Sequence, residues 1–157
     1  MSLAEVVGMY IAPASGRPMV AVDAVQAVTG RGLIGDRYYL GTGFYSQQPG
    51  WGANVTLLER ETLEAVNAGH QTDFCGEMLR RNIVTSNIKL ESLLGREFRC
   101  GSAILRGTKP FPPCAHLALL LGRREVLRYF AYSSGIGAEV VSDGEIRVHD
   151  RLERLAS

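Results

Sequence analysis

Hydrophobic residues alternate with polar residues, or form short β-branched runs, in eight places along the chain. These runs cover residues 6–11, 19–28, 54–58, 82–85, 97–100, 103–105, 139–141 and 145–148, and turn residues separate them. A period of two is typical of β-strands that bury one face. Closure protects the edges of many short strands, so the pattern predicts a mostly β fold with flanking helices, built as a closed β-barrel.

Helical patterns are fewer. Residues 60–68 carry an apolar stripe that ends at Gly69, and residues 91–94 can form one short turn. A third helix is expected to begin near Cys114 and to end at Gly122, and residues 123–132 can form a further helix. We expect these helices to cap or flank the barrel.

A loop over residues 40–53, between Tyr39 and Asn54, is rich in glycine and yet carries Phe44, Tyr45 and Trp51. It is long for a plain connection. The loop is either an Ω-loop that packs its own aromatic side chains onto the barrel, or a lid over a flat heterocycle. The sequence leaves both interpretations open.

Length and charge narrow the class of protein. A chain of 157 residues with 46% hydrophobic content favours a single domain over residues 1–157. The formal net charge of +1 provides no long-range attraction for nucleic acid or an anionic membrane, so we expect neither as a partner. Lys89 and Lys109 are the only lysines beside 15 arginines, whose planar guanidinium groups suit phosphate or carboxylate.

The cysteines and the first residues indicate a cellular compartment. Three cysteines without a C-x-x-C pair favour neither a disulfide framework nor a zinc knuckle, and a reducing environment fits them best. The first residues lack a basic region, Glu5 interrupts their apolar stretch, and no apolar run is long enough to cross a membrane. We therefore expect a cytoplasmic protein.

Cys114 is the strongest candidate for chemistry. It follows Pro112-Pro113 and should open a helix, whose N-terminal N–H groups favour a negatively charged sulfur. From the residues alone, Cys114 is either a small buried hydrophobic group or a working thiol. Cys100 fits a core position in a strand, while Cys75 fits either a loop or the core. His116 is expected to point away from Cys114 and to be structural or pocket-lining.

Two polar segments are candidates for anion binding. Arg80 and Arg81 precede an apolar strand, where alternation would send them to opposite faces and would place Asn82 on the face of Arg80. Arg80 and Asn82 could then clamp a phosphate, or both arginines could be solvated at the barrel rim. Residues 35–37, Gly-Asp-Arg, fit a turn that feeds a strand, without a nucleotide-binding motif.

Seven segments occur in a characteristic order along nearly the whole chain, from about Gly32 to Asp150. They are GLIGDRY followed by GTGF, VTLLE, RRNIVT, LLGREFRCG, PPCAHL and GAEVVSDGEIRVHD. Together they resemble the MOSC domain, the module named for the C-terminal part of molybdenum-cofactor sulfurases. The resemblance implies a β-barrel that binds the pterin of the molybdenum cofactor (molybdopterin) in a cleft. It also implies one cysteine that contacts molybdenum or bears a persulfide.

The resemblance assigns expected roles to residues of this chain. Cys114 matches the family's cysteine, which makes it the expected catalytic residue and metal ligand. The family's Arg-x-Asn segment is matched by Arg80 and Asn82, and its Gly-Asp-Arg turn by Gly35, Asp36 and Arg37. The expected cofactor-binding residues are therefore Arg80, Asn82, Asp36 and Arg37, together with Arg81, which the strand pattern adds.

The chain departs from the family pattern at three places. Pro112-Pro113 stands where an acidic residue plus proline is common, Gly137 where arginine is common, and His149 where glycine is common. Loss of the arginine would weaken anion binding. The chain matches neither the pyridoxal-phosphate desulfurase domain of fused sulfurases nor the ferredoxin domain of some relatives. We therefore expect no pyridoxal phosphate in this chain and an external reductase or cysteine desulfurase as partner.

Three functions remain open. In the first, Cys114 ligates molybdenum and the protein reduces a small N-hydroxylated substrate with an external electron donor. In the second, Cys114 carries sulfur as a persulfide for maturation of a metal–sulfur or molybdenum cofactor. In the third, the domain only binds a ligand. A Cys114 buried among aliphatic side chains would weaken the first two, and a Cys114 that faces a cleft with Arg80 or Arg81 would strengthen them.

Overall fold

A computed structural model describes residues 3–131 and 133–156 of the chain. Its elements in order are β1 (Glu5–Ile11), β2 (Val20–Ala21), β3 (Ala24–Val28), β4 (Gly32–Leu33), α1 (Arg37–Leu40), β5 (Val55–Glu59), α2 (Arg60–His70), β6 (Ile83–Ser86), the 3₁₀ helix η1 (Leu90–Leu93), β7 (Glu97–Cys100), β8 (Ala103–Pro110), α3 (Ala115–Leu121), α4 (Val126–Tyr129), β9 (Ile136–Ser142), β10 (Gly144–Arg147) and β11 (Leu152–Arg154). Each of the eight predicted strand regions contains a strand. The region 19–28 divides into β2 and β3, and β4 and β11 were not predicted.

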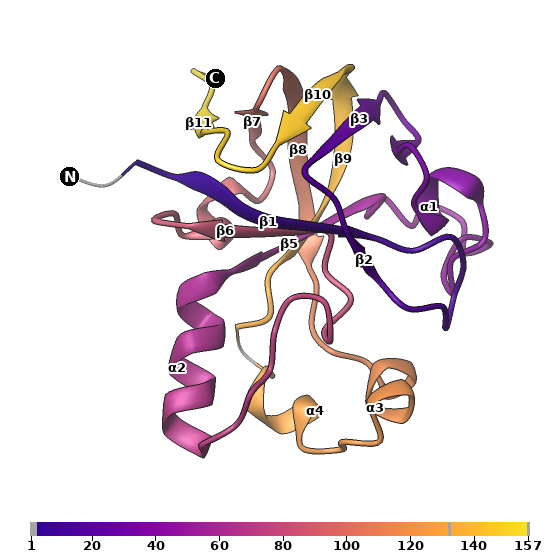
Figure 1. Cartoon of the computed structure of the whole chain (residues 1–157). Coiled ribbons are helices and arrows are strands. Elements are labelled where there is room, and N and C mark those ends of the chain that lie inside the picture. Colours follow the sequence, from indigo (N-terminus) through magenta and orange to yellow (C-terminus); the bar gives the residue numbers. More distant parts are fainter. Residues whose placement is uncertain (1–2, 132, 157) are drawn as a thin grey trace.

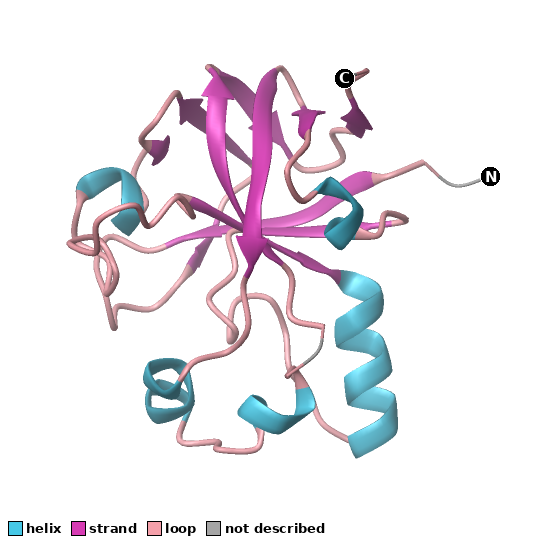
Figure 2. Ribbon diagram, turned by 180° about the vertical axis from the view of Figure 1, so that it is seen from behind, coloured by secondary structure: helices cyan, strands magenta, loops and turns pink. Residues whose placement is uncertain are grey.

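The strands form two sheets at one end of the molecule, and α2, α3 and α4 lie at the other end (Figures 1 and 2). The larger sheet has eight strands in the order β11-β7-β8-β9-β5-β6-β1-β2, and the smaller sheet has the order β10-β3-β4. Pairing is antiparallel except between β5 and β6, which run parallel and are joined through α2. The flanking position expected for the helices is therefore confirmed.

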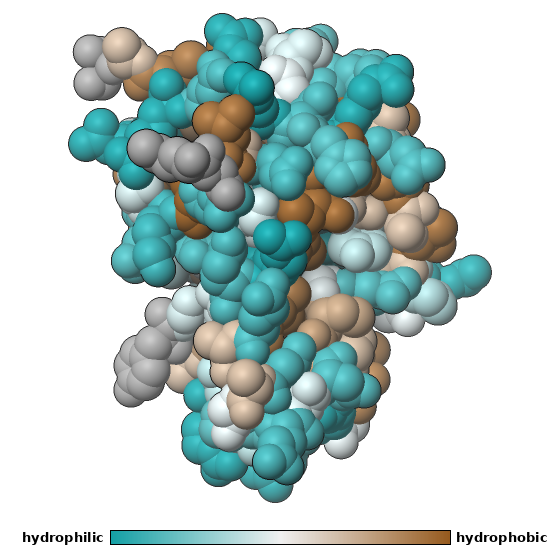
Figure 3. All heavy atoms as spheres, turned by 60° about the vertical axis from the view of Figure 1, so that its left-hand side comes forward, coloured by the Kyte–Doolittle hydropathy of each residue, from teal (hydrophilic) through white to brown (hydrophobic). Residues whose placement is uncertain are grey.

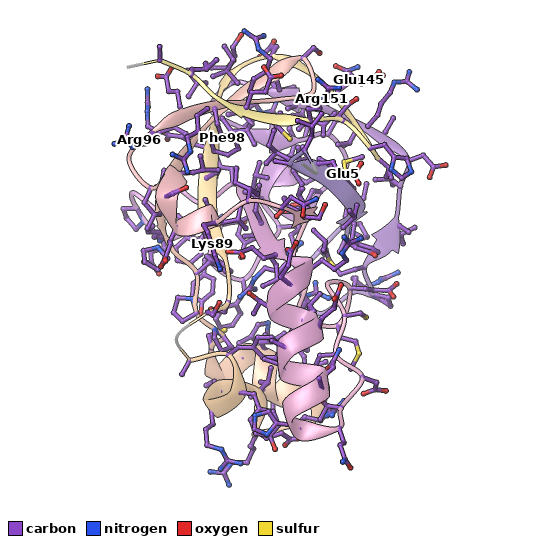
Figure 4. The ribbon with its side chains drawn as sticks, turned by 90° about the vertical axis from the view of Figure 1, so that its left-hand side faces the viewer. Glu5, Lys89, Arg96, Phe98, Glu145 and Arg151 are labelled. Atoms are coloured by element: carbon purple, nitrogen blue, oxygen red, sulfur yellow. The ribbon has the colours of Figure 1, made fainter. Side chains whose placement is uncertain are left out.

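The expected closed barrel is wrong, because both sheets are open. In the described part of the chain, β2 pairs only with β1 and β11 only with β7, so no ladder joins the two edges of the large sheet. Glu5 makes one isolated bridge to Arg151, both labelled in Figure 4, and this pairing does not extend. The edge strands have only two and three residues, and so short an edge needs no closure to limit pairing with other chains.

The parallel pair β5 and β6 separates two hydrophobic clusters. Leu57 and Ile83 face a cluster inside the strands, where Phe98 is fully buried (Figure 4). Their neighbours Leu58 and Val84 face a second cluster beneath α2, α3 and α4. Successive residues of a strand point to opposite faces, so an unbroken apolar run such as Val55–Leu58 can be buried on both. These two strands thus connect the strand-rich end to the helical end.

The surface in Figure 3 is largely hydrophilic, with hydrophobic patches interrupted by polar side chains. No helix in residues 3–131 and 133–156 combines the length and the apolar character that a membrane span requires. The last residue of the helix predicted over 123–132 lies outside the described residues, and α4 covers the middle of that range.

The segment Gly35-Asp36-Arg37 begins a short helix rather than the predicted strand. Asp36 is the N-cap of α1, and its Oδ2 accepts a hydrogen bond from the backbone N–H of Tyr38 at 3.2 Å. A carboxylate in this position satisfies a free N–H of the first helical turn, which explains why the turn continues as helix.

Asp36 also connects three segments in the interior. Its Oδ1 accepts hydrogen bonds from the backbone N–H of Ala12 (3.2 Å), from Asn82 Nδ2 (3.2 Å) and from Arg37 Nη1 (3.0 Å). Ala12 follows β1, Asn82 precedes β6, and Arg37 opens α1. The carboxylate is fully buried, and these donors together with Tyr38 N–H compensate for its desolvation.

We predict that Asp36→Asn destabilises the protein by about 3 kcal/mol or more, because the neutral amide leaves the buried Arg37 guanidinium without its counter-charge. Urea unfolding followed by circular dichroism measures the change. The control is Asp23→Asn at an exposed position, for which we expect a change within about 0.5 kcal/mol. Equal stabilities of the two variants would show that the Asp36 charge is unimportant.

A second prediction concerns Gly107 in β8, where a Cβ atom would lie 2.3 Å from the carbonyl oxygen of Leu93. Both atoms belong to backbone, so Gly107→Ala should cost on the order of 3 kcal/mol through overpacking. The control position is Gly69 in α2. Like Gly107 it does not have a left-handed φ, but a Cβ atom there would have no neighbouring atom within 4 Å. Gly69→Ala should therefore gain roughly 0.5–1 kcal/mol from helix propensity. Thermal unfolding of both variants checks the opposite signs.

Candidate functional site

A cavity of about 360 Å³ lies where the loop before β5, the segment before β6 and the segment after β8 come together. Its aromatic lining consists of Tyr38, Phe44, Tyr45, Trp51 and Phe111. Its cationic lining consists of Arg37, Arg80, Arg81 and Lys109, and Cys114 and His116 complete the reactive groups. Among the residues that the structure describes, no Asp or Glu lines this cavity. The cavity is therefore basic and aromatic, although the chain as a whole is nearly neutral.

Cys114 stands at the start of α3, as the sequence predicts. It is the N-cap residue with extended φ and ψ of −118° and 168°, and its carbonyl accepts the Ala118 N–H at 3.1 Å. The side chain is half-buried and lines the cavity together with Arg80 and Arg81. Pro112 and Pro113 fix the extended approach to the helix. The sulfur is thus held at a fixed place in the cavity wall.

Arg81 holds the segment that carries Cys114. Its Nη2 donates to the Phe111 carbonyl at 2.7 Å, its Nε to the Ser134 carbonyl at 3.1 Å, and its Nη1 to the Leu79 carbonyl at 3.0 Å. Its guanidinium carbon lies 4.6 Å from the centre of the Phe111 ring. The side chain is buried and not solvated at a rim, so that interpretation is wrong for Arg81.

Three backbone carbonyl oxygens and the Phe111 ring stabilise the positive charge of Arg81. In the described part of the chain, no carboxylate lies within salt-bridge distance of it. Burial lowers the pKa of Arg81 to about 10, and the proximity of Cys114 acts in the opposite direction. The guanidinium therefore remains positive at neutral pH.

Arg80 and Asn82 do not share a strand face, so the predicted clamp is wrong in its geometry. Arg80 has a left-handed φ of 58°, and β6 begins only at Ile83. The Arg80 side chain lines the cavity and donates to the carbonyls of Arg17 (2.6 Å) and Ala14 (3.5 Å). Burial, followed by the charge of Arg37, lowers the pKa of Arg80.

Asn82 is fully buried behind the cavity. Its Oδ1 accepts the Thr56 N–H at 3.0 Å, and its Nδ2 donates to the Tyr10 carbonyl at 3.1 Å and to Asp36. Asp36 is equally buried, and neither residue lines the cavity. Their expected contact with a cofactor stays a prediction, and the structure shows them as supports for Arg37.

Arg37 joins this support to the cavity. Its Nη1 is paired with Asp36 Oδ1 at 3.0 Å, and its Nη2 donates to the Arg80 carbonyl at 3.1 Å. It is almost fully buried but reaches the cavity lining. Asp36 thereby fixes both Arg37 and the backbone of Arg80.

The aromatic loop both packs on itself and lines the cavity. Tyr45 stacks on Trp51 with ring centres 4.3 Å apart, and Phe44 stacks on His116 at 3.8 Å. Lys109 Nζ lies 3.5 Å from the centre of the Trp51 ring, a cation–π contact. The sequence had singled out the loop through its aromatic content, but Lys109 had no local signal.

Two groups of this wall have unusual surroundings. Trp51 Nε1 is buried and has no hydrogen-bond partner within the described residues. Burial, followed by the neighbouring Cys114 sulfur, raises the pKa of Tyr45 to about 12. Tyr45 therefore keeps its proton at neutral pH, and the indole N–H of Trp51 is a buried donor.

The other cysteines lie away from the cavity. Cys100 is fully buried in the strand core, as predicted, and burial raises its pKa to about 12. Cys75 is half-buried and is not part of the cavity lining. In the described residues, no group of three or more His, Cys, Asp or Glu side chains is placed to hold a metal ion.

Gly137 explains one departure from the family pattern. A Cβ atom at this position of β9 would lie 2.5 Å from Ala53 Cβ, so a larger side chain does not fit without movement of the neighbouring chain. The basic character of the cavity therefore depends on other positions, chiefly Arg80, Arg81 and Lys109.

Comparisons with known proteins agree on one family. The family model of the MOSC domain matches residues 45–153. No curated protein matches the chain. Among solved structures, the chain is similar to the YuaD protein from Bacillus subtilis, with a TM-score of 0.80, 18% identity, and coverage of 99% of this chain and 98% of that chain.

It is also similar to YiiM from Geobacillus stearothermophilus, with a TM-score of 0.73, 15% identity, and coverage of 98% of this chain and 75% of that chain. For YiiM from Escherichia coli, the TM-score is 0.71 at 17% identity, and the match covers 98% of this chain and 70% of that chain. At these identities the likeness concerns the fold, and the family model covers most of the cavity-lining residues in sequence. The chain belongs to the MOSC domain family.

Proposed function

We propose that this MOSC domain binds the molybdenum cofactor in the Cys114 cavity and reduces small N-hydroxylated substrates with electrons from an external reductase. In this proposal Cys114 supplies the one sulfur ligand that the protein gives to the metal. The observation that carries the proposal is the placement of a half-buried thiol in a cavity with four cationic side chains and, among the described residues, no carboxylate.

The charge of the cavity fits an anionic group. Arg81 is buried without a carboxylate partner in the described chain, which is costly unless an anion approaches it. Arg80 and Lys109 are less deeply buried and can reach a phosphate such as the one that molybdopterin carries. A thiolate at Cys114 and a phosphate would each lie among positive charges.

The shape and lining fit a flat heterocycle. A volume of about 360 Å³ lies within the range of about 300–1,000 Å³ typical of small-molecule sites. Tyr45 and Trp51 offer stacked aromatic surfaces in the lining of the cavity. These features support the binding of a pterin in the cavity.

The roles of the chain's own residues follow from their contacts. When bound, the cofactor would supply the two-electron chemistry that removes the oxygen of an N-hydroxyl group, with release of water. Arg81 and Ser134 both donate to the Phe111 carbonyl and so fix the backbone that leads to Cys114. Tyr45 holds its proton in the wall of the cavity, and the aromatic side chains exclude water.

The three free cysteines and the need for a soluble electron donor fit a cytoplasmic location, which is part of the proposal.

A second function, transfer of sulfur as a Cys114 persulfide delivered by a cysteine desulfurase, is favoured by one observation. Cys114 is only half-buried and lies beside cationic groups, which suits attack on a donor persulfide.

We predict that protein purified from cells that make the cofactor contains near-stoichiometric molybdenum and pterin, and that Cys114→Ala loses the molybdenum. The physical reason is that, among the described residues, Cys114 is the one thiol in the cavity lining, and a soft thiolate is the ligand proposed for the metal. Elemental analysis gives the metal content, and fluorescence of the oxidised pterin gives the cofactor content. Cys75→Ala is the matched control, because this thiol is also half-buried but lies outside the cavity.

Absence of both metal and pterin from the native protein would overturn the cofactor proposal. Persulfide trapping at Cys114 with an added cysteine desulfurase would then test the sulfur-carrier function. Labelling of Cys114 but not of Cys75 would support that function, and labelling of neither would leave binding without covalent chemistry as the role of the cavity.

A further inference from the structure

Large hydrophobic side chains are exposed on α3 and on the aromatic loop. Leu119 is 80% exposed, Phe44 53% and Leu120 42%, although the same helix buries Leu117 and Ala118. Single exposed hydrophobic residues are common on protein surfaces, but neighbouring ones indicate a site of interaction. Leu119 and Leu120 are consecutive, and Phe44 stacks on His116 of the same helix.

These side chains lie next to residues that line the Cys114 cavity. Phe44 and His116 line the cavity, and Phe44 is also exposed. The segment 13–18 lies beside α3, because Ser15 Oγ is 3.4 Å from His116 Nε2 and a Cβ atom at Gly16 would lie 4.0 Å from Leu120 Cδ2. α4 packs next to α3 at the helical end of the molecule (Figures 1 and 2). We call residues 13–18, Phe44 and residues 115–130, which include α3 and α4, the rim surface.

Arginines outnumber acids on the rim surface. Residues 13–18 and 115–130 contain one acid, Glu125, and four arginines, namely Arg17, Arg123, Arg124 and Arg128. Arg123 is engaged by Glu125 at 3.2 Å and by Asp73 at 3.0 Å. The other three arginines have no carboxylate within salt-bridge distance in the part of the chain that the structure describes. The exposed apolar centre is thus flanked by free positive charges.

The exposed leucines and Phe44 beside arginines favour a protein as the partner. Protein interfaces are enriched in arginine and aromatic residues. Electron-transfer complexes are small, transient and steered by opposite charges. A partner that must reach the cavity opening would meet this surface.

We propose that the rim surface docks an acidic electron-transfer protein, whose carboxylates face Arg17, Arg124 and Arg128 and whose apolar centre covers Leu119, Leu120 and Phe44. This inference rests on the proposed function, because that reaction takes two electrons from an external donor. The reduction consumes two electrons and two protons, and the N-hydroxyl oxygen leaves as water. A donor that carries one electron, such as a [2Fe–2S] ferredoxin, therefore docks twice for each turnover and is oxidised by one electron each time.

The experiment measures binding of the native chain to two acidic probes, a flavodoxin and a plant-type [2Fe–2S] ferredoxin, by isothermal titration calorimetry at low salt. We expect at least one probe to bind, with an affinity that falls as salt rises. Leu119→Glu and Arg124→Glu should each weaken that binding about tenfold or more, since they place like charges opposite the probe. Matched controls are Leu3→Glu, at a leucine 56% exposed, and Arg96→Glu, at the strand-rich end of the molecule (Figure 4).

A second readout separates this inference from the proposed function. Leu119→Glu should keep its molybdenum and pterin and should be reduced normally by reduced benzyl viologen, while its reduction by the bound probe slows by about tenfold. Absence of cofactor in the native protein would overturn the proposed function, whereas binding is measured without turnover and stands by itself.

Three results would overturn the docking proposal. The first is that neither probe binds, or that the control variants weaken binding as much as the rim variants. The second is that the native chain is a dimer and Leu119→Glu is a monomer, which would assign the surface to a second copy. The third is sedimentation with phosphatidylglycerol vesicles without binding to either protein probe, which would assign it to a membrane.

Discussion

The Asp36 carboxylate is the contact on which the arrangement of the cavity depends. It accepts hydrogen bonds from Ala12, Arg37, Tyr38 and Asn82, which belong to the end of β1, to α1 and to the segment before β6. A buried carboxylate requires such donors, and the donors in turn fix where these segments can lie. Arg37, held by this carboxylate, then donates to the Arg80 carbonyl and orients the next cationic residue.

The two most deeply buried arginines of the cavity differ in one respect. Arg37 has a counter-charge in Asp36, while Arg81 has only carbonyl oxygens and the Phe111 ring. A buried cation without a counter-charge favours the binding of an anion, because the anion supplies the charge that carbonyl oxygens and a ring do not. A chain with a net charge of +1 can therefore hold a strongly basic site.

Much of the fold could be predicted from hydrophobic periodicity, and the errors have physical causes. The strand positions follow from alternation, and the end of α3 at Gly122 follows from its left-handed conformation. The closed barrel was predicted because closure protects exposed strand edges. This prediction is wrong because the edge strands β2 and β11 are too short to need closure. The helix that begins at Arg37 was not predicted. Its N-cap carboxylate, Asp36, also accepts hydrogen bonds from buried groups, and the local sequence does not reveal these contacts.

The candidate site shows the same limit at Arg80. Alternation along a strand would place Arg80 and Arg81 on opposite faces, yet the left-handed φ of 58° at Arg80 precedes the strand and breaks that pattern. Nothing in the residue type signals this conformation, which glycine or asparagine would adopt more readily. The turn is held from outside, by the bond of Arg37 to the Arg80 carbonyl and by the bonds of the Arg80 side chain to residues 14 and 17. Because it allows both arginines to reach one cavity, the basic character of the Cys114 site is a product of tertiary contacts and not of the local pattern.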